Sequence, residues 1–177
     1  MPELLISLAT LKSLAYLLGS VGILVEWRAY CLHNPYDFRR WSAVGAILWA
    51  TQYYLLDAFT AALTMGSTAI RTLLSGYLEM PQYKHAAALV CVSLFSLLTA
   101  SSWQGIISLL PAFAVINTTL ALFYLANRPM RICLLASSSA WIMNDLYWQA
   151  WPALLAESVA VFINLHTIHK LLAAEKL

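Results

Sequence analysis

The stretch Trp141-Ile142-Met143-Asn144-Asp145-Leu146-Tyr147-Trp148 places an amide and a carboxylate inside a run of apolar residues. At the helical spacing i, i+3, i+4 and i+7, one face of this segment carries Trp141, Asn144, Asp145 and Trp148. A polar face in such a segment should point toward protein or water rather than toward lipid. The same spacing recurs earlier in the chain, at Trp49, Gln52, Tyr53 and Leu56. The two stretches therefore predict a duplicated helix with a shared aromatic and polar lining.

The composition is that of an integral membrane protein. Of the 177 residues, 62% are hydrophobic and only 10% are charged, whereas a soluble domain has about 25% charged residues. A helix needs about 20 residues to cross the bilayer, so the chain has room for about seven or eight spans and no soluble domain. Its formal net charge of +2, from scattered basic residues, excludes a nucleic-acid surface.

The chain lacks the motifs of a metal site or of a catalytic site. Cys31, Cys91 and Cys133 form no Cys-x-x-Cys pair and are expected to be small core residues. His166 and His169 stand at i, i+3, but no carboxylate or thiol is spaced to complete a metal site with them. Phosphate loops, nucleophile elbows and metalloprotease motifs are also missing. We therefore expect no metal, no cofactor and no enzymatic activity.

Apolar runs predict seven spans, at about residues 4–25, 41–56, 58–77, 86–100, 103–126, 130–148 and 152–172. Residues 26–40 are expected to form the longest loop, and Pro81 to mark the boundary between two halves. Pro111 is expected to kink the fifth span. Residues 127–129, Asn-Arg-Pro, are expected to form a turn.

The basic residues predict the orientation of these spans. With seven spans, the connections on one side carry Arg28, Arg39, Arg40, Lys84, Arg128, Arg131, Lys170 and Lys176, and the opposite connections carry none. Basic loops remain in the cytoplasm. We therefore expect the amino terminus outside and the carboxyl terminus in the cytoplasm, whereas six spans would scatter these charges over both sides.

A shift of 92 residues aligns the two halves of the chain. It places Arg39 on Arg131, Trp49 on Trp141 and Gln52 on Asn144, among other matches. The resulting prediction is an all-α membrane protein in a 3+1+3 arrangement of two parallel three-helix repeats. The repeats are residues 1–78 and 103–177, and a linker over residues 79–102 contains the fourth helix.

Trp49 and Trp141 should lie near the membrane midplane, about 15 Å from the arginines at the cytoplasmic edge. Tryptophans usually lie at the headgroups, so two at mid-depth need another explanation. We predict that they line a central cavity. In it the two indoles stack on a flat or ring-shaped solute, and Gln52 and Asn144 bond to it. The alternative is that these residues fill the core and join helices. Asn117 and Asn164, in the inner half, have the same two interpretations.

Charged residues inside the spans also have two interpretations each. Asp145 and Glu157, with Lys12 at a similar depth, form either a proton or ion relay or an ion pair that locks the halves together. Arg71 is either a side chain that extends to the lipid phosphates or a residue that binds an anionic solute or closes an inner gate.

Short motifs in order along nearly the whole chain carry a resemblance to a known family. They are Asn34 with Arg39-Arg40, Ala69-Ile70-Arg71-Thr72-Leu73, Leu110-Pro111, Met130-Arg131, Trp141-Ile142 with Asn144, and Glu157. In these the chain resembles the YgjV family of small bacterial inner-membrane proteins. The resemblance implies a multi-pass protein of the bacterial inner (plasma) membrane.

More distantly, the expected 3+1+3 layout is similar to that of the MtN3-like superfamily of SWEET sugar carriers and PnuC vitamin-precursor transporters. In those proteins a tryptophan and an asparagine from each half enclose the solute, and prolines in the first helix of each half act as gating hinges. The similarity implies solute binding by Trp49 with Gln52 and by Trp141 with Asn144. It implies a hinge at Pro111, whose repeat mate is Gly19.

Two functions follow as expectations. The first is a facilitator or carrier for a small polar solute, alone in the lipid bilayer or as a homo-oligomer. The second is an accessory or assembly subunit of a larger inner-membrane complex, in which the same residues pack against other membrane subunits. A carrier should be stabilised by its solute, whereas a subunit should be purified with its partners.

Overall fold

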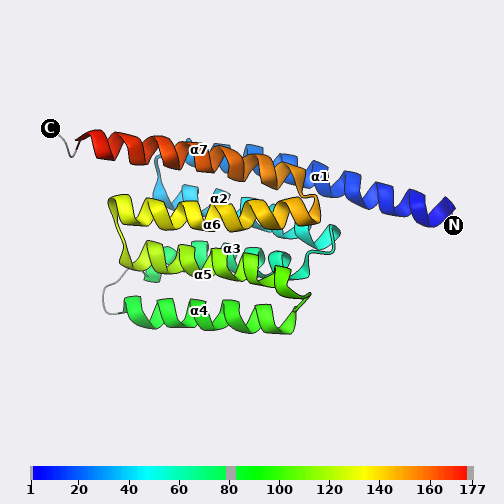
Figure 1. Ribbon diagram of the computed structural model, residues 1–177, viewed down its shortest axis with the longest axis horizontal. Coiled ribbons are helices and arrows are strands. Elements are labelled where there is room, and N and C mark those ends of the chain that lie inside the picture. Colours follow the sequence, from blue (N-terminus) through cyan, green and yellow to red (C-terminus); the bar gives the residue numbers. More distant parts are fainter. Residues whose placement is uncertain (1, 79–82, 175–177) are drawn as a thin grey trace.

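The computed structural model describes residues 2–78 and 83–174, and this part of the chain is helical apart from short connections. Its elements are α1 (Pro2–Tyr30), α2 (Pro35–Leu55), α3 (Phe59–Leu78), α4 (Lys84–Ser101), the 3-10 helix η2 (Ile106–Ser108), α5 (Leu109–Tyr124), α6 (Asn127–Trp148) and α7 (Trp151–Ala174). The helices run along one axis, with the two termini at opposite ends (Figure 1). The predictions of an all-α fold and of seven helices are confirmed.

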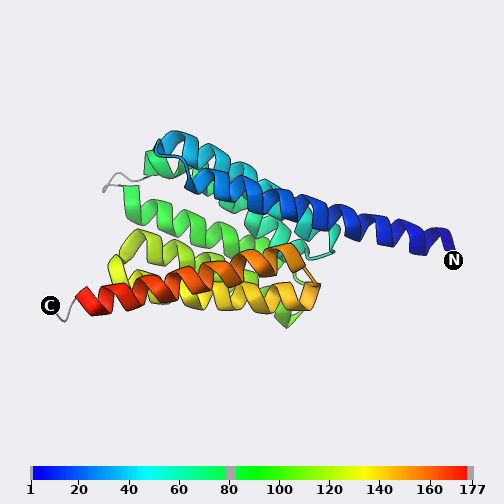
Figure 2. The same ribbon diagram turned by 90° about the horizontal axis from the view of Figure 1, so that it is seen from above.

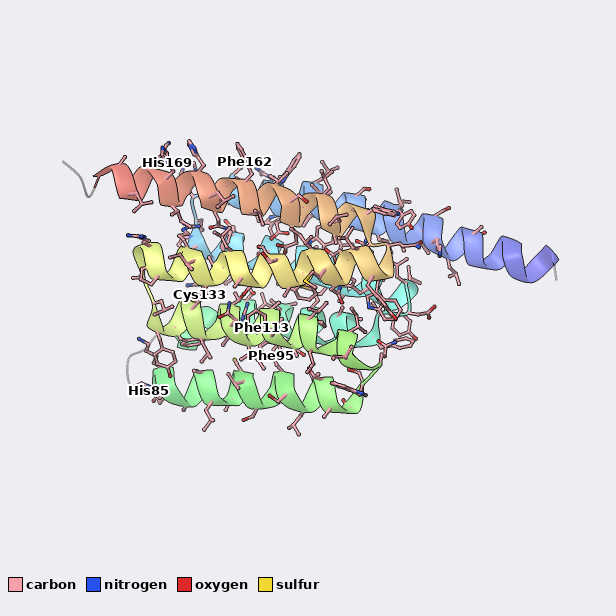
Figure 3. The ribbon with its side chains drawn as sticks, in the orientation of Figure 1. His85, Phe95, Phe113, Cys133, Phe162 and His169 are labelled. Atoms are coloured by element: carbon pink, nitrogen blue, oxygen red, sulfur yellow. The ribbon has the colours of Figure 1, made fainter. Side chains whose placement is uncertain are left out.

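Four of the helices are long and apolar enough to cross a membrane on their own. Their apolar segments are Ala9–Ala29, Lys84–Ser101, Ile106–Tyr124 and Trp151–Lys170. Large apolar side chains cover the outer surface, where Leu97 is 68% exposed and Phe162 is 71% exposed. Phe162 and His169 point away from the bundle on α7 (Figure 3). This surface suits contact with lipid acyl chains, because hydrocarbon imposes no penalty on exposed apolar groups.

The connection between α1 and α2 is much shorter than the predicted loop over residues 26–40. α1 continues to Tyr30 and α2 begins at Pro35. The Asn34 Oδ1 atom accepts a 2.9 Å hydrogen bond from the Tyr36 backbone N–H, which caps α2. Proline suits the first helical position because a backbone N–H there would have no partner within the helix. The polar residues therefore belong to the last turns of α1 and the first turns of α2.

Two prolines lie at helix starts rather than within helices. α5 begins at Leu109, so Pro111 is in its first turn. The first four N–H groups of a helix have no partner within it, so a proline there breaks no hydrogen bond. The predicted kink is therefore wrong. The predicted turn over residues 127–129 is also wrong, because α6 already begins at Asn127. The boundary expected at Pro81 lies outside the described residues.

The helices form two rows that face each other. In one row α1 packs on α2 and α2 on α3, and in the other α5 packs on α6 and α6 on α7. Contacts of α3 with α5 and of α1 with α7 join the rows, and α4 packs against α3 and α5 (Figure 1). Seen from above, α1 and α7 lie closest near the start of α7 and separate toward the carboxyl end of α7 (Figure 2).

Small residues allow the close packing in this bundle. Ala15, Ala58, Ala61, Ala114 and Ala150 are completely buried. Because lipid is as apolar as a leucine side chain, helices in a membrane associate through close packing of small residues rather than through burial from water. The buried alanines therefore supply the contact surface of the bundle.

The tight connections after α2 and α6 have the same geometry. Asp57 and Gln149 have left-handed backbone conformations, with φ of 62° and 56°. The N–H of Ala58 donates to the carbonyl of Tyr53 at 2.9 Å, and that of Ala150 donates to Asp145 at 2.8 Å. Corresponding residues of the two turns are 92 positions apart, the shift that aligns the sequence. The sequence repeat is therefore also a repeat of local structure.

A hydroxyl cluster joins α3 to the segment between α4 and α5. The buried Thr60 hydroxyl donates a 2.7 Å hydrogen bond to the carbonyl of Ser102 and lies 3.0 Å from the hydroxyl of Ser108. The Gln104 amide bonds to the carbonyl of Asp57 at 2.6 Å. These bonds satisfy polar groups at helix ends, which is required of backbone groups away from water.

Candidate solute cavity

A cavity of about 880 Å³ lies between the two rows of helices. It reaches the end of the bundle where α2, α4 and α6 begin, since Pro35 and Lys84 are among its walls. Its polar and charged lining consists of Glu26, Arg39, Ser42, Thr68, Arg71, Thr72, Lys84, Thr118, Thr119, Arg131, Ser137, Ser138, Glu157 and Asn164. Its volume falls within the range of about 300–1,000 Å³ that is usual for small-molecule sites.

The deep end of the cavity is formed by an aromatic side chain. Trp141 is 6% exposed and lines the cavity near the middle of α6. The Tyr53 ring stacks on it with centroids 5.6 Å apart and an interplanar angle of 16°. Trp49 is 5% exposed, and its indole N–H donates a 3.1 Å hydrogen bond to Glu26, which also lines the cavity. A flat indole wall suits an apolar or ring-shaped part of a solute.

A cluster of buried polar side chains lies one turn beyond Trp141. Gln52, Tyr53, Asn144 and Asp145 are each at most 2% exposed. The Tyr53 hydroxyl donates a 2.7 Å hydrogen bond to Oδ1 of Asp145, and the Asn144 amide lies 3.3 Å from the same oxygen. None of the four residues lines the cavity. The cluster therefore lies beyond the deep end of the cavity, on the side away from the basic residues.

Within residues 2–78 and 83–174, several atoms of this polar cluster have no hydrogen-bond partner. They are both side-chain polar atoms of Gln52, Oδ1 of Asn144 and Oδ2 of Asp145. An unsatisfied buried polar group typically costs about 1–3 kcal/mol. A concentration of such groups at one depth is typical of a functional site, where a second conformation or a ligand satisfies them.

Glycines on α1 bring α2 close enough to bury this cluster. A Cβ at Gly19 would collide with the Gln52 amide and lie 2.9 Å from Cβ of Pro152, on α7. A Cβ at Gly22 would lie 3.2 Å from the Trp49 indole. Gly19 therefore allows three helices, α1, α2 and α7, to meet beside Gln52.

Two arginines in the cavity lining each bond to a neutral side chain. Arg71 donates a 2.6 Å hydrogen bond to the Thr119 hydroxyl, and its guanidinium lies 5.9 Å from the centroid of the Phe95 ring. Figure 3 shows Phe95 between α4 and α5. Arg131 donates a 3.0 Å bond to Oδ1 of Asn164. Glu157 and Ser138 both line the cavity.

One family model matches a range of this chain that includes every residue lining the cavity. The model of the Imp-YgjV family, described as a bacterial inner membrane protein, matches residues 13–175. The chain belongs to this family. No curated protein and no solved structure gave a match. The YgjV resemblance and the inner-membrane location expected from the sequence are thereby confirmed, and this YgjV-family chain has several helices apolar enough to cross that membrane.

The predicted site residues are divided between the cavity and its surroundings. Trp141 and Asn164 line the cavity of this family member, and so do Arg71 and Glu157. Trp49, Gln52 and Asn144 are buried next to it rather than in its walls. Asn117 bonds to the Cys133 carbonyl at 2.6 Å and to Ser137 at 2.8 Å, so it joins α5 to α6.

The predicted ion pair with Lys12 is not formed. Lys12 is exposed on α1, and the partner of Asp145 is the neutral side chain of Tyr53. Gly19 is the α1 residue that meets Gln52, and Lys12 stands seven residues before it, so it lies about 10 Å farther along the helix axis. Pro111 and Gly19, the expected hinge pair, are both buried but do not line the cavity.

Two important residues were outside the predicted site. Glu26 was assigned to a loop, although it lies in α1 and accepts the Trp49 hydrogen bond. Tyr53 was noted only for its spacing, although its repeat mate, 92 positions later, is Asp145. The described residues contain no group of three or more metal-ligating side chains.

Proposed function

We propose that this chain is a carrier for a small polar solute, with SWEET- or PnuC-like architecture. Its two three-helix repeats would move relative to each other around the cavity. The observation that carries the proposal is the cavity of about 880 Å³, whose walls come from both halves of the chain and whose deep end is Trp141. A protein that served only as packing for partner helices would have no need for a polar cavity in its own interior.

The packing of the helices supports a parallel 3+1+3 arrangement. Under a shift of 92 residues α1 corresponds to α5, α2 to α6 and α3 to α7. The contact between α3 and α5 then corresponds to the contact between α7 and α1, and both are present. Two such equivalent contacts are expected when two parallel repeats are related by a twofold axis along the membrane normal.

The distribution of charge supports an orientation with the cavity open to the cytoplasm. Arg39, Lys84 and Arg131 lie near the starts of α2, α4 and α6, at the end that the cavity reaches. The positive-inside rule assigns this end to the cytoplasm. We infer that the amino terminus is outside and that this structure corresponds to an inward-open state. The Tyr53–Asp145 hydrogen bond then closes the outer side.

A ligand screen on the purified protein tests the carrier proposal. Libraries of neutral, anionic and cationic metabolites are added in detergent, and the melting temperature is measured, because a ligand of the folded state raises it. We expect at least one class to stabilise the wild type but not Trp141→Ala. The control Trp151→Ala changes an exposed tryptophan outside the cavity. Stabilising compounds are then tested for uptake into vesicles.

The opposite result of this screen would favour the second function. If no compound stabilises the protein and another membrane protein copurifies with it in fixed stoichiometry, the carrier proposal is wrong. The same result would support the assembly-subunit alternative.

A further inference from the structure

We infer that the solute of this cavity is a small organic anion with a carboxylate or phosphate group, held by Arg71 and Arg131. The inference rests on the proposed carrier function, since it names the solute class of the same cavity. Arg71 belongs to α3 in one half of the chain and Arg131 to α6 in the other, and both line the cavity.

The first step of the argument is the charge of the lining. Four basic residues line the cavity, Arg39, Arg71, Lys84 and Arg131, against two acidic ones, Glu26 and Glu157. The Glu26 carboxylate already accepts a hydrogen bond from the Trp49 indole. The cavity therefore has an excess of positive charge, which attracts anions and repels cations.

The second step is the set of partners of these two arginines. Within the described residues, Arg71 bonds to Thr119 and lies over the Phe95 ring, and Arg131 bonds to Asn164. Neither forms an ion pair with a described carboxylate. A guanidinium has five N–H donors in a planar fork that matches carboxylate and phosphate oxygens. Each arginine retains donors that an anion in the cavity can use.

The third step is the depth of the Arg71 charge. Arg71 lies about two helical turns, or about 10 Å, before the end of α3. A cation removed from bulk water without an anionic partner is unfavourable. A solute anion between the two arginines would supply that partner from within the cavity. It would also connect the two halves of the chain, as a solute that drives their closure must do.

The fourth step is the shape of the cavity. Trp141 forms its deep wall, while the arginines lie nearer the mouth. A solute that satisfies both has an anionic group toward the mouth and an apolar or flat part toward the indole. This arrangement favours an organic anion over an inorganic one.

The experiment compares probes that differ only in charge. The protein in phosphatidylcholine nanodiscs is melted with benzoate, benzamide, succinate, succinamide or inorganic phosphate at matched ionic strength. We expect the two carboxylates to stabilise the wild type and the two amides to have little effect. Arg71→Gln and Arg131→Gln should each weaken the apparent carboxylate affinity about tenfold, the usual effect of losing one charged hydrogen bond.

Control variants separate this effect from general charge and from folding. Arg28→Gln removes an exposed arginine at the same end of the bundle that is outside the cavity, and it should leave carboxylate binding unchanged. Arg71→Lys keeps the charge but loses the planar fork, so it should bind with intermediate affinity. The melting temperature of each variant is first measured without ligand, to show that it is folded. If Arg71→Gln does not fold, the carboxylate affinity of Arg131→Gln alone tests the inference.

The outcomes distinguish the solute class from the carrier proposal. If amides stabilise the wild type as well as carboxylates do, and the arginine variants retain this effect, the anion inference is overturned while the carrier remains. If none of the probes and none of the metabolites in the library stabilises the protein, both the anion inference and the carrier proposal are overturned. If only nanodiscs with phosphatidylglycerol stabilise the wild type, and not Arg71→Gln or Arg131→Gln, the site holds a lipid headgroup and the solute inference is wrong.

Discussion

The hydroxyl of Tyr53 donates a 2.7 Å hydrogen bond to the carboxylate of Asp145, and these two residues occupy equivalent positions in the two halves, 92 residues apart. Equivalent residues of two repeats can touch only where the repeats meet. Both are completely or almost completely buried, at 2% and 0% exposure. This bond therefore lies at the centre of the contact between the halves, beyond the deep end of the cavity.

We expect Tyr53→Phe to weaken the contact between the halves. The substitution removes the hydroxyl and leaves Oδ1 of Asp145 with only the longer bond to Asn144. A side-chain hydrogen bond between membrane helices contributes about 1 kcal/mol, so the melting temperature in detergent should fall by about 2–4 °C. Tyr147→Phe, at a residue that is 61% exposed, is the control. Equal melting temperatures for both variants would show that the bond contributes nothing.

We expect Gly19→Ala to destabilise the bundle and Gly66→Ala to leave it unchanged. A Cβ at Gly19 collides with the Gln52 amide, whereas at Gly66 the nearest atom is Cβ of Ala50 at an ordinary 3.8 Å. Overpacking of this kind costs about 1–3 kcal/mol, measured as a fall in melting temperature. The double variant Gly19→Ala with Gln52→Ala should recover part of the loss. No recovery would mean that the crowding lies elsewhere.

We expect Thr60→Val to loosen the connection between α3 and the segment after α4. Valine has the same shape but cannot bond to the Ser102 carbonyl or the Ser108 hydroxyl. The buried groups left without a partner should cost about 1–3 kcal/mol of stability. Thr51→Val is the matched control, because Thr51 is exposed and bonds only to its own helix at the Ile47 carbonyl. Similar melting temperatures for the two variants would contradict this role.

We expect cysteine labelling to show a cavity open to the cytoplasm. In a background without the three native cysteines, Thr118→Cys should react with a membrane-impermeant maleimide from the cytoplasmic side, because Thr118 lines the cavity. Ser139→Cys, on the outer surface of α6, should not react, because lipid covers it. Reaction of Thr118→Cys from the opposite side alone would reverse the proposed orientation. If Thr118→Cys reacts from neither side of the membrane, the cavity is not open in this state.

The buried aromatic and amide residues were partly predictable. The spacing of Trp49 with Gln52, and of Trp141 with Asn144, predicts one buried face on each helix, and all four are buried. The sequence could not show that the amides lie outside the cavity. Residues on the same inward face of a helix can either line the cavity or pack against another helix. Whether an inward-facing residue meets space or another helix depends on the distance between helices.

The seven helices, the basic end of the bundle and the buried face of α6 were determined by the sequence itself. They depend on local properties, namely the length of apolar runs, the positions of charged residues and the helical period. The tertiary structure alone decided that Tyr53 rather than Lys12 is the partner of Asp145, and that Asn117 joins α5 to α6. It also decided that Arg71 and Arg131 face one cavity. Such partnerships depend on how helices far apart in the chain pack and rotate against one another, and close approaches such as that at Gly19 determine this packing.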